Sequence, residues 1–323
     1  MIEQLMLKKA LITGISGFAG SYLAEFLLSQ NYQVFGIVRE KDNPNLAQIQ
    51  KKIKLFQADL QDKKQVKKVL AEVAPDQIYH LAGFSVPRLS FGKTAEVFEA
   101  NVIPAINLFE SLVELKLAST FVNIGSSEEY GLTKNGKISE NTTFNPASPY
   151  AVSKLAQDFL GFFYFKNHGI PVIRLRPFNH IGPRQEPVIA VANFAKQIAQ
   201  IEAGAQESVI KVGNLKAKRD FCDVRDMVEA YWLAADKCTP GEVYNIGSGI
   251  SYSLAQILEI LLSFSKIKIK VKVDKNLLRS LDVPEFVANP AKFIKATGWK
   301  PKIKLGKTLK DILNYWRTQL RSA

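Results

Sequence analysis

Cysteine is scarce in this chain, and long apolar runs are absent from it. Cys222 and Cys238 are the only cysteines among 323 residues, too few for a disulfide framework, so a reduced, cytoplasmic setting is expected. No run of about 18 apolar residues occurs, which argues against a membrane-spanning helix. The opening residues, MIEQLMLKKALITG, lack a signal-peptide pattern and lead directly into a short apolar segment. These absences favour a globular protein with no membrane partner.

Negative charge is also in short supply, and the excess of positive charge indicates an anionic ligand. The formal net charge is +13, which suits a dinucleotide or a nucleoside diphosphate, with nucleic acid as the rival interpretation. The lysines are dispersed, and the densest stretch, residues 266–272, alternates with Ile and Val. This alternation predicts a half-buried strand with a solvated lysine face. Nucleic acid is therefore not expected as a partner.

A strand, a glycine-rich turn and a helix follow one another near the N-terminus. Residues 8–13 predict a short strand, the turn reads GISGFAG, and residues 21–29 predict an apolar helix. The first glycine permits the tight turn, the second lets the backbone approach a pyrophosphate, and the third lets the helix pack on the strand. The helix N-terminus attracts an anion through its free N–H groups and dipole. The expected cofactor contacts are Gly14, Ser16, Gly17, Phe18, Ala19 and Gly20.

A tyrosine and a lysine four residues apart indicate a proton-transfer site. Tyr150 and Lys154 lie in the string SPYAVSK, and this spacing puts both side chains on one face of a helix. A nearby lysine cation favours the phenolate, so we expect it to lower the Tyr150 pKa, and reaching about 7 requires about 4 kcal/mol. Ser126, just after a predicted strand over 120–124, is then available to hold the reacting oxygen. The alternative is a surface Tyr and Lys on an amphipathic helix.

The glycine turn and the Tyr/Lys pair together resemble the extended short-chain dehydrogenase/reductase family, over essentially the whole chain. The resemblance implies a hydride-transferring α/β enzyme on a nucleotide sugar, with Ser126, Tyr150 and Lys154 on the family's catalytic positions. It implies a Rossmann-type, doubly wound, mostly parallel sheet and a smaller α/β C-terminal substrate domain, with the active site between them. The expected cofactor-binding domain is 1–177 plus 220–247, and the expected substrate domain is 178–219 plus 248–323.

The resemblance also assigns cofactor contacts beyond the glycine turn. Arg39, at the end of the second predicted strand, suits a 2′-phosphate and so NADP(H), while Glu40 keeps NAD(H) open; the alternative for Arg39 is a solvated loop charge. Asp59 matches an adenine contact, or a plain helix N-cap. His80 is expected to be a packed core residue, not a metal ligand, and no metal site is expected. The remaining assigned contacts are Leu60, Leu81, Ala82, Gly83 and Pro177, together with Tyr150 and Lys154.

Several residues are assigned to a nucleotide-sugar substrate. Residues 84–88 form a loop that the family uses against the sugar, and the string RPFNHIGP carries a residue that contacts sugar or diphosphate. A guanidinium fork suits phosphate oxygens, so two arginines are diphosphate candidates, although Arg219 is alternatively explained by a buried pair with Asp220 or Asp223. The expected substrate contacts are Ser85, Ser127, Asn179, Lys196, Arg219 and Arg279.

Two predicted helices, 96–117 and 150–167, have apolar residues over a wide arc. The family pairs such helices into a four-helix dimer interface, which predicts a homodimer; the alternative is an intramolecular core. The apolar residues are Phe98, Val102, Leu108 and Leu112 on the first helix and Leu155, Phe159, Phe162 and Phe163 on the second.

Three branches of the family compete: C4 epimerases, 4,6-dehydratases and 4-keto reductases. Ser127 stands where dTDP-sugar dehydratases carry an Asp, whereas Glu128 matches the catalytic base of GDP-mannose 4,6-dehydratases. The strings GSSEEYG, SPYAVSK, RPFNHIGP, YNIGSG and LLRSLDVP together look most like GDP-4-keto-6-deoxy-D-mannose reductases. The expected reaction is NAD(P)H-dependent reduction of the C4 ketone to a GDP-6-deoxyhexose of the GDP-D-rhamnose type.

Two departures from the reductase pattern leave the sugar open. Arg184 stands where Gly is usual before Gln185, and residues 279–282 read RSLD in place of the usual RPSE. A non-enzymatic NADP sensor is a further alternative, although such proteins tend to lose the Tyr or the Lys. Ser126, Tyr150 and Lys154 are all present.

Overall fold

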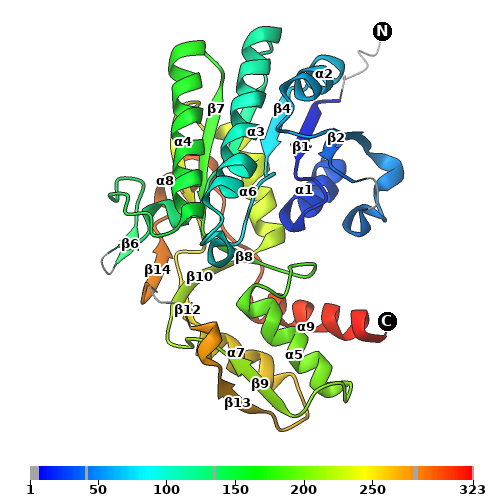
Figure 1. Ribbon diagram of the computed structural model, residues 1–323, viewed down its shortest axis with the longest axis vertical. Helices are drawn as coiled ribbons and strands as arrows, with labels where there is room; N and C mark the ends of the chain where they lie inside the picture. Colours follow the sequence, from blue (N-terminus) through cyan, green and yellow to red (C-terminus); the bar gives the residue numbers. More distant parts are fainter. Residues whose placement is uncertain (1–6, 41–42, 134–135, 279–282, 322–323) are drawn as a thin grey trace.

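The large sheet of the computed structural model, which describes residues 7–40, 43–133, 136–278 and 283–321, is entirely parallel. Its seven strands run in the order β11-β7-β5-β4-β1-β2-β3, the doubly wound arrangement expected of a Rossmann-type sheet (Figure 1). The strands are β1 (Lys9–Thr13), β2 (Gln33–Val38), β3 (Lys54–Gln57), β4 (Gln77–His80), β5 (Thr120–Ile124), β7 (Val172–Pro177) and β11 (Val243–Ile246). The predicted fold class is therefore confirmed.

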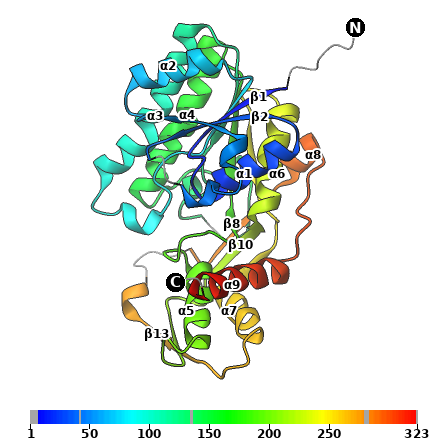
Figure 2. The same cartoon turned by 90° about the vertical axis from the view of Figure 1, so that its right-hand side faces the viewer.

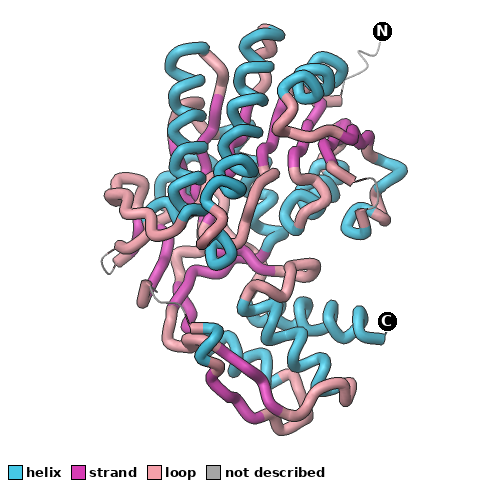
Figure 3. Tube along the Cα trace, viewed as in Figure 1, coloured by secondary structure: helices cyan, strands magenta, loops and turns pink. Residues whose placement is uncertain are grey.

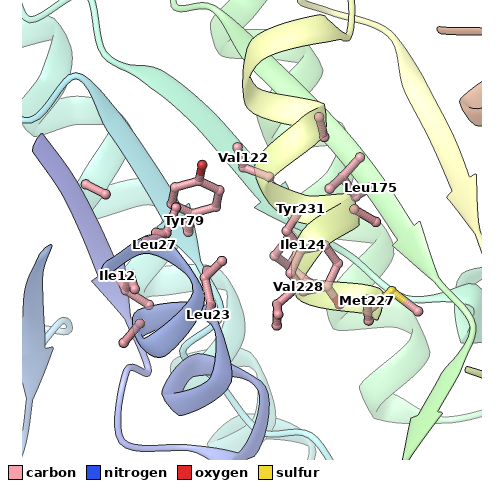
Figure 4. Close-up of a cluster of buried hydrophobic side chains, with 14 of the residues drawn as sticks. Ile12, Leu23, Leu27, Tyr79, Val122, Ile124, Leu175, Met227, Val228 and Tyr231 are labelled. Atoms are coloured by element: carbon pink, nitrogen blue, oxygen red, sulfur yellow. The ribbon is translucent and has the colours of Figure 1, made fainter. Parts of the chain in front are cut away.

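Helices cover both faces of this sheet, because alternate residues of its strands are apolar on both sides. On one face, Ile12 and Leu175 pack with α1 (Phe18–Ser29) and α6 (Val224–Lys237), as Figure 4 shows. On the other, Leu11 and Phe121 pack with α2 (Lys63–Val73), α3 (Thr94–Leu115) and α4 (Pro149–His168). The carboxyl ends of the strands are left for loops, where a ligand site is expected.

The C-terminal stretch contributes to the core of the large sheet. Phe293, on α8 (Ala291–Thr297), and Trp299 are buried in the same cluster as Tyr244 of β11. In Figure 2 α8 lies beside α6, and the chain then runs down to α9 (Leu305–Arg321). Helix α8, which the sequence analysis expected in the substrate domain, thus packs against the large sheet.

A smaller α/β part lies beyond the carboxyl ends of the large sheet (Figure 3). A five-stranded sheet has the order β12-β10-β14-β6, with β8 paired to β10. A separate core joins α5 (Ala190–Glu202), α7 (Leu254–Ser263) and α9. The strands are β6 (Lys137–Ile138), β8 (Asn179–Ile181), β10 (Lys218–Asp223), β12 (Ser251–Ser253) and β14 (Glu285–Ala288), with a two-stranded sheet of β9 (Val209–Val212) and β13 (Lys270–Val273).

The lysine-rich strand differs from its prediction. It was expected over 266–272 with one buried face, but β13 begins at Lys270 and all four of its residues are exposed. Val271 and Val273 are 44% and 56% exposed. Among the described residues β13 pairs only with β9, in a two-stranded sheet, and neither face of the strand is buried. Alternation of lysine with apolar residues predicts a strand, but it does not predict whether another element packs against the apolar face.

Short 3-10 helices lie within the loops: η1 (Pro44–Leu46), η2 (Gln50–Lys52), η3 (Pro87–Ser90), η4 (Ser127–Tyr130) and η5 (Lys275–Leu277). Of these, η4 matters most, because it directly follows β5 at the carboxyl edge of the large sheet. Within the described ranges, no helix combines the length and the apolar character needed to cross a bilayer.

Candidate active site

Ser126 and Tyr150 meet where β5 and α4 approach one another. Ser126 caps η4, its hydroxyl accepting from the Glu128 amide at 3.1 Å, and it also hydrogen-bonds the Tyr150 phenol. Tyr150 is the second residue of α4, a helix that starts here because Ser148 caps it and Pro149 occupies its first position. The two hydroxyls predicted to share a reacting oxygen are therefore adjacent.

Lys154 lies one turn further along α4 and is held by the protein itself. Its Nζ donates to the carbonyl of Ile124 and to Oε1 of Gln157, both at 2.9 Å. Gln157 is fixed in turn by Asn123, to which its amide donates at 2.6 Å. Burial lowers the Lys154 pKa to about 8.

The expected lowering of the Tyr150 pKa is not found in the protein chain. Burial raises the Tyr150 pKa well above its usual value, the Ser126 hydrogen bond opposes this, and the charges of Glu128 and Glu129 raise it further. The physical reason is that the phenol sits in a site that disfavours its charged form, while the Lys154 ammonium is directed at a carbonyl and an amide. The charge of Glu128 therefore acts on the Tyr150 phenol.

The glycine turn has the geometry of a dinucleotide-binding loop. Gly14 has φ +71°, and a Cβ there would lie 2.7 Å from the amide nitrogen of Ala82. A Cβ on Gly20 would lie 2.1 Å from the Gly14 carbonyl oxygen, so only glycine fits. Gly17 is the N-cap of α1, with no side-chain cap and no acidic residue in the first turn. The amides of Phe18 and Ala19 therefore begin a helix that is open to a pyrophosphate, and the residues fit an NAD(P) cofactor.

The loop after β4 joins the cofactor side to the catalytic helix. The Leu81 and Ala82 amides donate to Thr13, at 3.2 Å each, and Thr13 also bonds Nδ1 of His80 at 2.8 Å. His80 is fully buried, as expected of a core residue. Gly83 has φ +149°, a conformation that favours glycine.

Asn101 was noticed in the sequence only as a polar residue inside a helix, yet it links two parts of the site. It accepts from the Phe84 amide at 2.6 Å and donates to Ser153 at 2.8 Å. Ser153 in turn donates to the Tyr150 carbonyl at 2.8 Å. The loop that carries Ser85, itself exposed, is thereby tied to the first turn of α4.

The other predicted cofactor contacts occupy the carboxyl edge of the sheet. Arg39 is exposed after β2, and its carbonyl accepts from Gln57 at 3.0 Å. Asp59 accepts from the Gln61 amide at 2.9 Å, but Asp62 is the residue that caps α2, so the N-cap interpretation of Asp59 was wrong. Leu60 is partly buried, and Pro177 is buried at the end of β7. The Ser16 carbonyl accepts from the Asn45 side-chain amide at 3.0 Å.

The predicted substrate contacts are spread over both parts of the fold. Ser127 is buried in η4, and Asn179 begins β8 directly after β7. Arg219, on β10, donates to the Val283 carbonyl at 2.8 Å. Lys196, on α5, has its Nζ 5.2 Å from the centre of the Trp316 ring. Arg279 lies outside the described residues.

Asp220 and Asp223, the two residues named as alternative partners of Arg219, are bonded to other groups. Asp220 is fully buried and accepts from the amides of Ser248, Gly249 and Ala288. Asp223 caps α6 and pairs with Arg225 and Thr308. Both carboxylates hold loops together.

A buried ion-pair network behind Ser126 was missed by the sequence analysis. Glu129 accepts from the Ser126 amide at 2.7 Å and pairs with Nε of Arg176 at 2.8 Å. Arg176 also donates to Asp158 on α4, at 2.5 Å. Burial and the nearby Asp158 raise the Glu129 pKa well above its usual value. One signal was readable: Ser126 and Glu129 have the spacing of a capping box, which the structure forms.

Comparison with known proteins identifies the family. The family model described as GDP-mannose 4,6 dehydratase matches residues 11–312. The chain belongs to this family. The expected membership of the extended short-chain dehydrogenase/reductases is thereby confirmed.

Relatives within and around the GDP-mannose 4,6 dehydratase family span nearly the full chain. The GDP-6-deoxy-D-mannose reductase of Pseudomonas aeruginosa is 30% identical, covering 98% of this chain and 99% of the relative. The GDP-mannose 4,6 dehydratase 2 of Caenorhabditis elegans is also 30% identical, covering 95% and 88%.

Two solved structures with similar folds contain a bound cofactor. The structure of RMD from Pseudomonas aeruginosa complexed with NADPH superposes with a TM-score of 0.86 at 29% identity, covering 97% of this chain and 99% of that one. A Thermus thermophilus UDP-glucose 4-epimerase complex with NAD has a TM-score of 0.85 at 26% identity, covering 96% and 99%. Both cofactor types named in the sequence analysis therefore occur among the structural neighbours.

Proposed function

We propose that this protein uses NADPH to reduce the C4 ketone of GDP-4-keto-6-deoxy-D-mannose, giving a GDP-6-deoxyhexose of the GDP-D-rhamnose type. The observation that carries the proposal is the contact between Ser126 and Tyr150, with Lys154 one turn away, beside a glycine turn that fits a dinucleotide. The named reductase from Pseudomonas aeruginosa supports the choice of reaction.

The chemistry follows from the state of each side chain. When bound, the nicotinamide supplies the hydride. Tyr150, whose phenol carries its proton at neutral pH, donates that proton to O4 as general acid. The Ser126 hydroxyl hydrogen-bonds the same oxygen as negative charge develops on it. Lys154 contributes positive charge below pH about 8 and holds the nicotinamide ribose.

The binding residues form two groups in this proposal. Cofactor contacts are the glycine turn, Arg39, Asp59, the loop 81–83 and Pro177. Substrate contacts are Ser85, Ser127, Asn179, Lys196, Arg219 and Arg279, between the two proposed domains. We also propose a cytoplasmic enzyme, since Cys222 and Cys238 are both free thiols, and a homodimer built on α3 and α4.

The test of the reaction is NADPH consumption with freshly made GDP-4-keto-6-deoxymannose, with product configuration at C4 read by NMR. Loss of NADPH absorbance in step with product formation supports the reductase. Absence of consumption, with GDP-mannose instead converted to the keto sugar, would assign the dehydratase reaction. That second candidate is favoured by one observation: the charge of Glu128, the residue that matches the dehydratase base, acts on the Tyr150 phenol.

Replacing the proposed general acid provides the matching variant. Tyr150→Phe keeps the ring but removes the proton, so turnover should fall by about 10²- to 10⁴-fold, while NADPH binding, followed by fluorescence, stays near that of the unmodified protein. Ser148→Ala, which removes only the helix cap, is the control for a structural effect. A Tyr150→Phe enzyme with near-normal turnover would refute the role.

A further inference from the structure

Arg184 occupies a backbone conformation that normally favours glycine. Its φ is +71°, and a residue with a side chain persists there only where its surroundings hold it in place. The resemblance described in the sequence analysis implies glycine here, so the backbone conformation agrees with that expectation and the arginine side chain departs from it.

Three groups of one helix hold the Arg184 guanidinium. Its Nη2 pairs with Oε1 of Glu25 at 2.8 Å, its Nη1 donates to the Ser21 hydroxyl at 3.2 Å, and its Cζ lies 4.3 Å from the centre of the Tyr22 ring. All three partners belong to α1, the helix that begins at the glycine turn. The Arg184 and Glu25 side chains are only 21% and 29% exposed, so solvent screens this pair less than an ordinary surface pair.

Neighbouring contacts attach the rest of the loop to the same helix. The Tyr22 hydroxyl donates to the Pro183 carbonyl at 3.2 Å. The His180 ring stacks on Phe18, with centroids 5.8 Å apart and planes 5° from parallel. A Cβ on Gly182 would lie 3.4 Å from the tip of the Phe18 ring and 2.6 Å from a Val224 methyl group, which shows how closely the loop approaches.

The loop so attached leads from β7 into the proposed substrate side. It begins with Asn179, and the side-chain amide of Gln185 donates to the His180 carbonyl at 3.1 Å. Oε1 of Gln185 is buried and has no hydrogen-bond partner within the described part of the chain. An acceptor of this kind is costly unless a ligand or water satisfies it. The loop therefore carries polar groups for a ligand while Arg184 fixes it to the cofactor helix.

We propose that Arg184 is a positioning residue that couples the two ligand sites, because it joins the loop 179–185 to the helix that receives the dinucleotide. Dinucleotide binding then orders the loop, and an ordered loop receives the second ligand more readily. By linkage the effect is reciprocal: each ligand tightens the binding of the other by the same factor. The part concerning the second ligand rests on the proposed function, whereas the ordering of the loop by the dinucleotide does not.

The first experiment is hydrogen–deuterium exchange of peptides covering 181–189, with and without saturating NADPH. In the unmodified protein, NADPH should slow exchange there. Arg184→Gly, which the backbone tolerates, and Glu25→Gln should each lose most of that protection while exchange in the glycine turn still slows. Lys54→Gln, which breaks an exposed 2.8 Å pair with Glu72, is the control. Equal protection in Arg184→Gly and in the unmodified protein would overturn the proposal; if that variant fails to fold, Glu25→Gln decides.

The second experiment measures the coupling itself, as the NADPH dissociation constant with and without GDP. GDP should tighten NADPH binding by a factor of about 5 or more in the unmodified protein, and by a factor close to one in Arg184→Gly. Binding of GDP without any effect on NADPH in the unmodified protein would refute the coupling. Failure of GDP to bind at all counts instead against the proposed GDP-sugar site, and the exchange experiment then judges Arg184 alone.

Discussion

Tyr150 and Lys154 show one physical effect with opposite signs. Burial disfavours the charged form of each, so it raises the pKa of the phenol and lowers that of the ammonium. A raised pKa keeps the phenol protonated but makes it a weaker acid, so transfer of its proton depends on positive charge supplied nearby, which Lys154 carries. The spacing in the sequence correctly predicted that the two residues are neighbours on one helix. The direction in which the Tyr150 pKa changes depends on burial, and the spacing of two residues gives no information about burial.

The lowered pKa of Lys154 predicts an alkaline limb in the activity profile. A lysine with a pKa of about 8 is a cation below that pH and neutral above it. We expect kcat/KM to fall as pH rises through about 8. Lys154→Arg, whose guanidinium stays charged throughout this range, should be slower but without that limb. An unchanged limb in Lys154→Arg would assign the titration to another group.

Arg39 gives a prediction about cofactor choice. If it binds the 2′-phosphate of NADPH, Arg39→Ala removes a charge-assisted hydrogen bond of about 1.5–3 kcal/mol, so the KM for NADPH should rise about tenfold or more. The KM for NADH, which lacks that phosphate, should change little. Lys51→Ala, another exposed cation nearby in the chain, is the control, and an equal effect of Arg39→Ala on both cofactors would contradict the assignment.

At the scale of elements, the ion-pair network joins η4 and α4, the two segments that carry the catalytic groups, to the neighbouring strand β7. Glu129 lies in η4, Arg176 in β7 and Asp158 in α4. All three side chains are at most 2% exposed. Such a network costs desolvation free energy, but breaking it from one side leaves uncompensated buried charge.

Removal of the central arginine should therefore be strongly destabilising. Arg176→Met leaves Glu129 and Asp158 buried without it, and we expect the free energy of unfolding to fall by about 3–5 kcal/mol, measured by urea denaturation. The control, Lys54→Gln, removes an exposed pair and should cost at most about 1 kcal/mol. Equal losses in the two variants would mean that the network does not hold these elements together.

Helices and strands were predictable where the residues of a single segment carry the apolar or capping pattern that forms the element. The strand over 120–124 was placed correctly, and the glycine turn and the start of α4 followed from local chemistry. Contacts between distant segments were not predictable, because Glu129, Arg176 and Asp158 come together only through the order of strands in the sheet. The same limit explains β13, since a period of two residues does not reveal whether another element covers the strand.

At the scale of the whole molecule, some apolar residues of α3 and α4 belong to the core of the chain and others lie on its surface. Leu108 and Leu112 are buried within the chain, as the intramolecular alternative proposed. Phe159, Phe162 and Phe163 remain 50%, 40% and 48% exposed. Exposed aromatic side chains grouped on one helix are typical of a protein interface, and they support the proposed homodimer.

Charge placed on this helix should separate the dimer. The double variant Phe159→Glu/Phe163→Glu puts two carboxylates on the exposed arc, so light scattering after gel filtration should give the mass of one chain, against two for the unmodified protein. Val273→Glu, equally exposed but on β13, should leave the dimer intact. A monomeric unmodified protein, or a double variant that stays dimeric, would exclude this interface.

The late position of β11 and α8 has a consequence for synthesis. The edge strand of the large sheet ends at Ile246, and Phe293 and Trp299, which lie later in the chain, complete the apolar core on that side of the sheet. A ribosome must therefore synthesise and release residues up to Trp299 before that core is complete, although many domains finish folding as their own segment emerges. Until then, Tyr244 and its neighbours lack part of their final apolar covering, and transiently exposed apolar surface of this kind promotes aggregation.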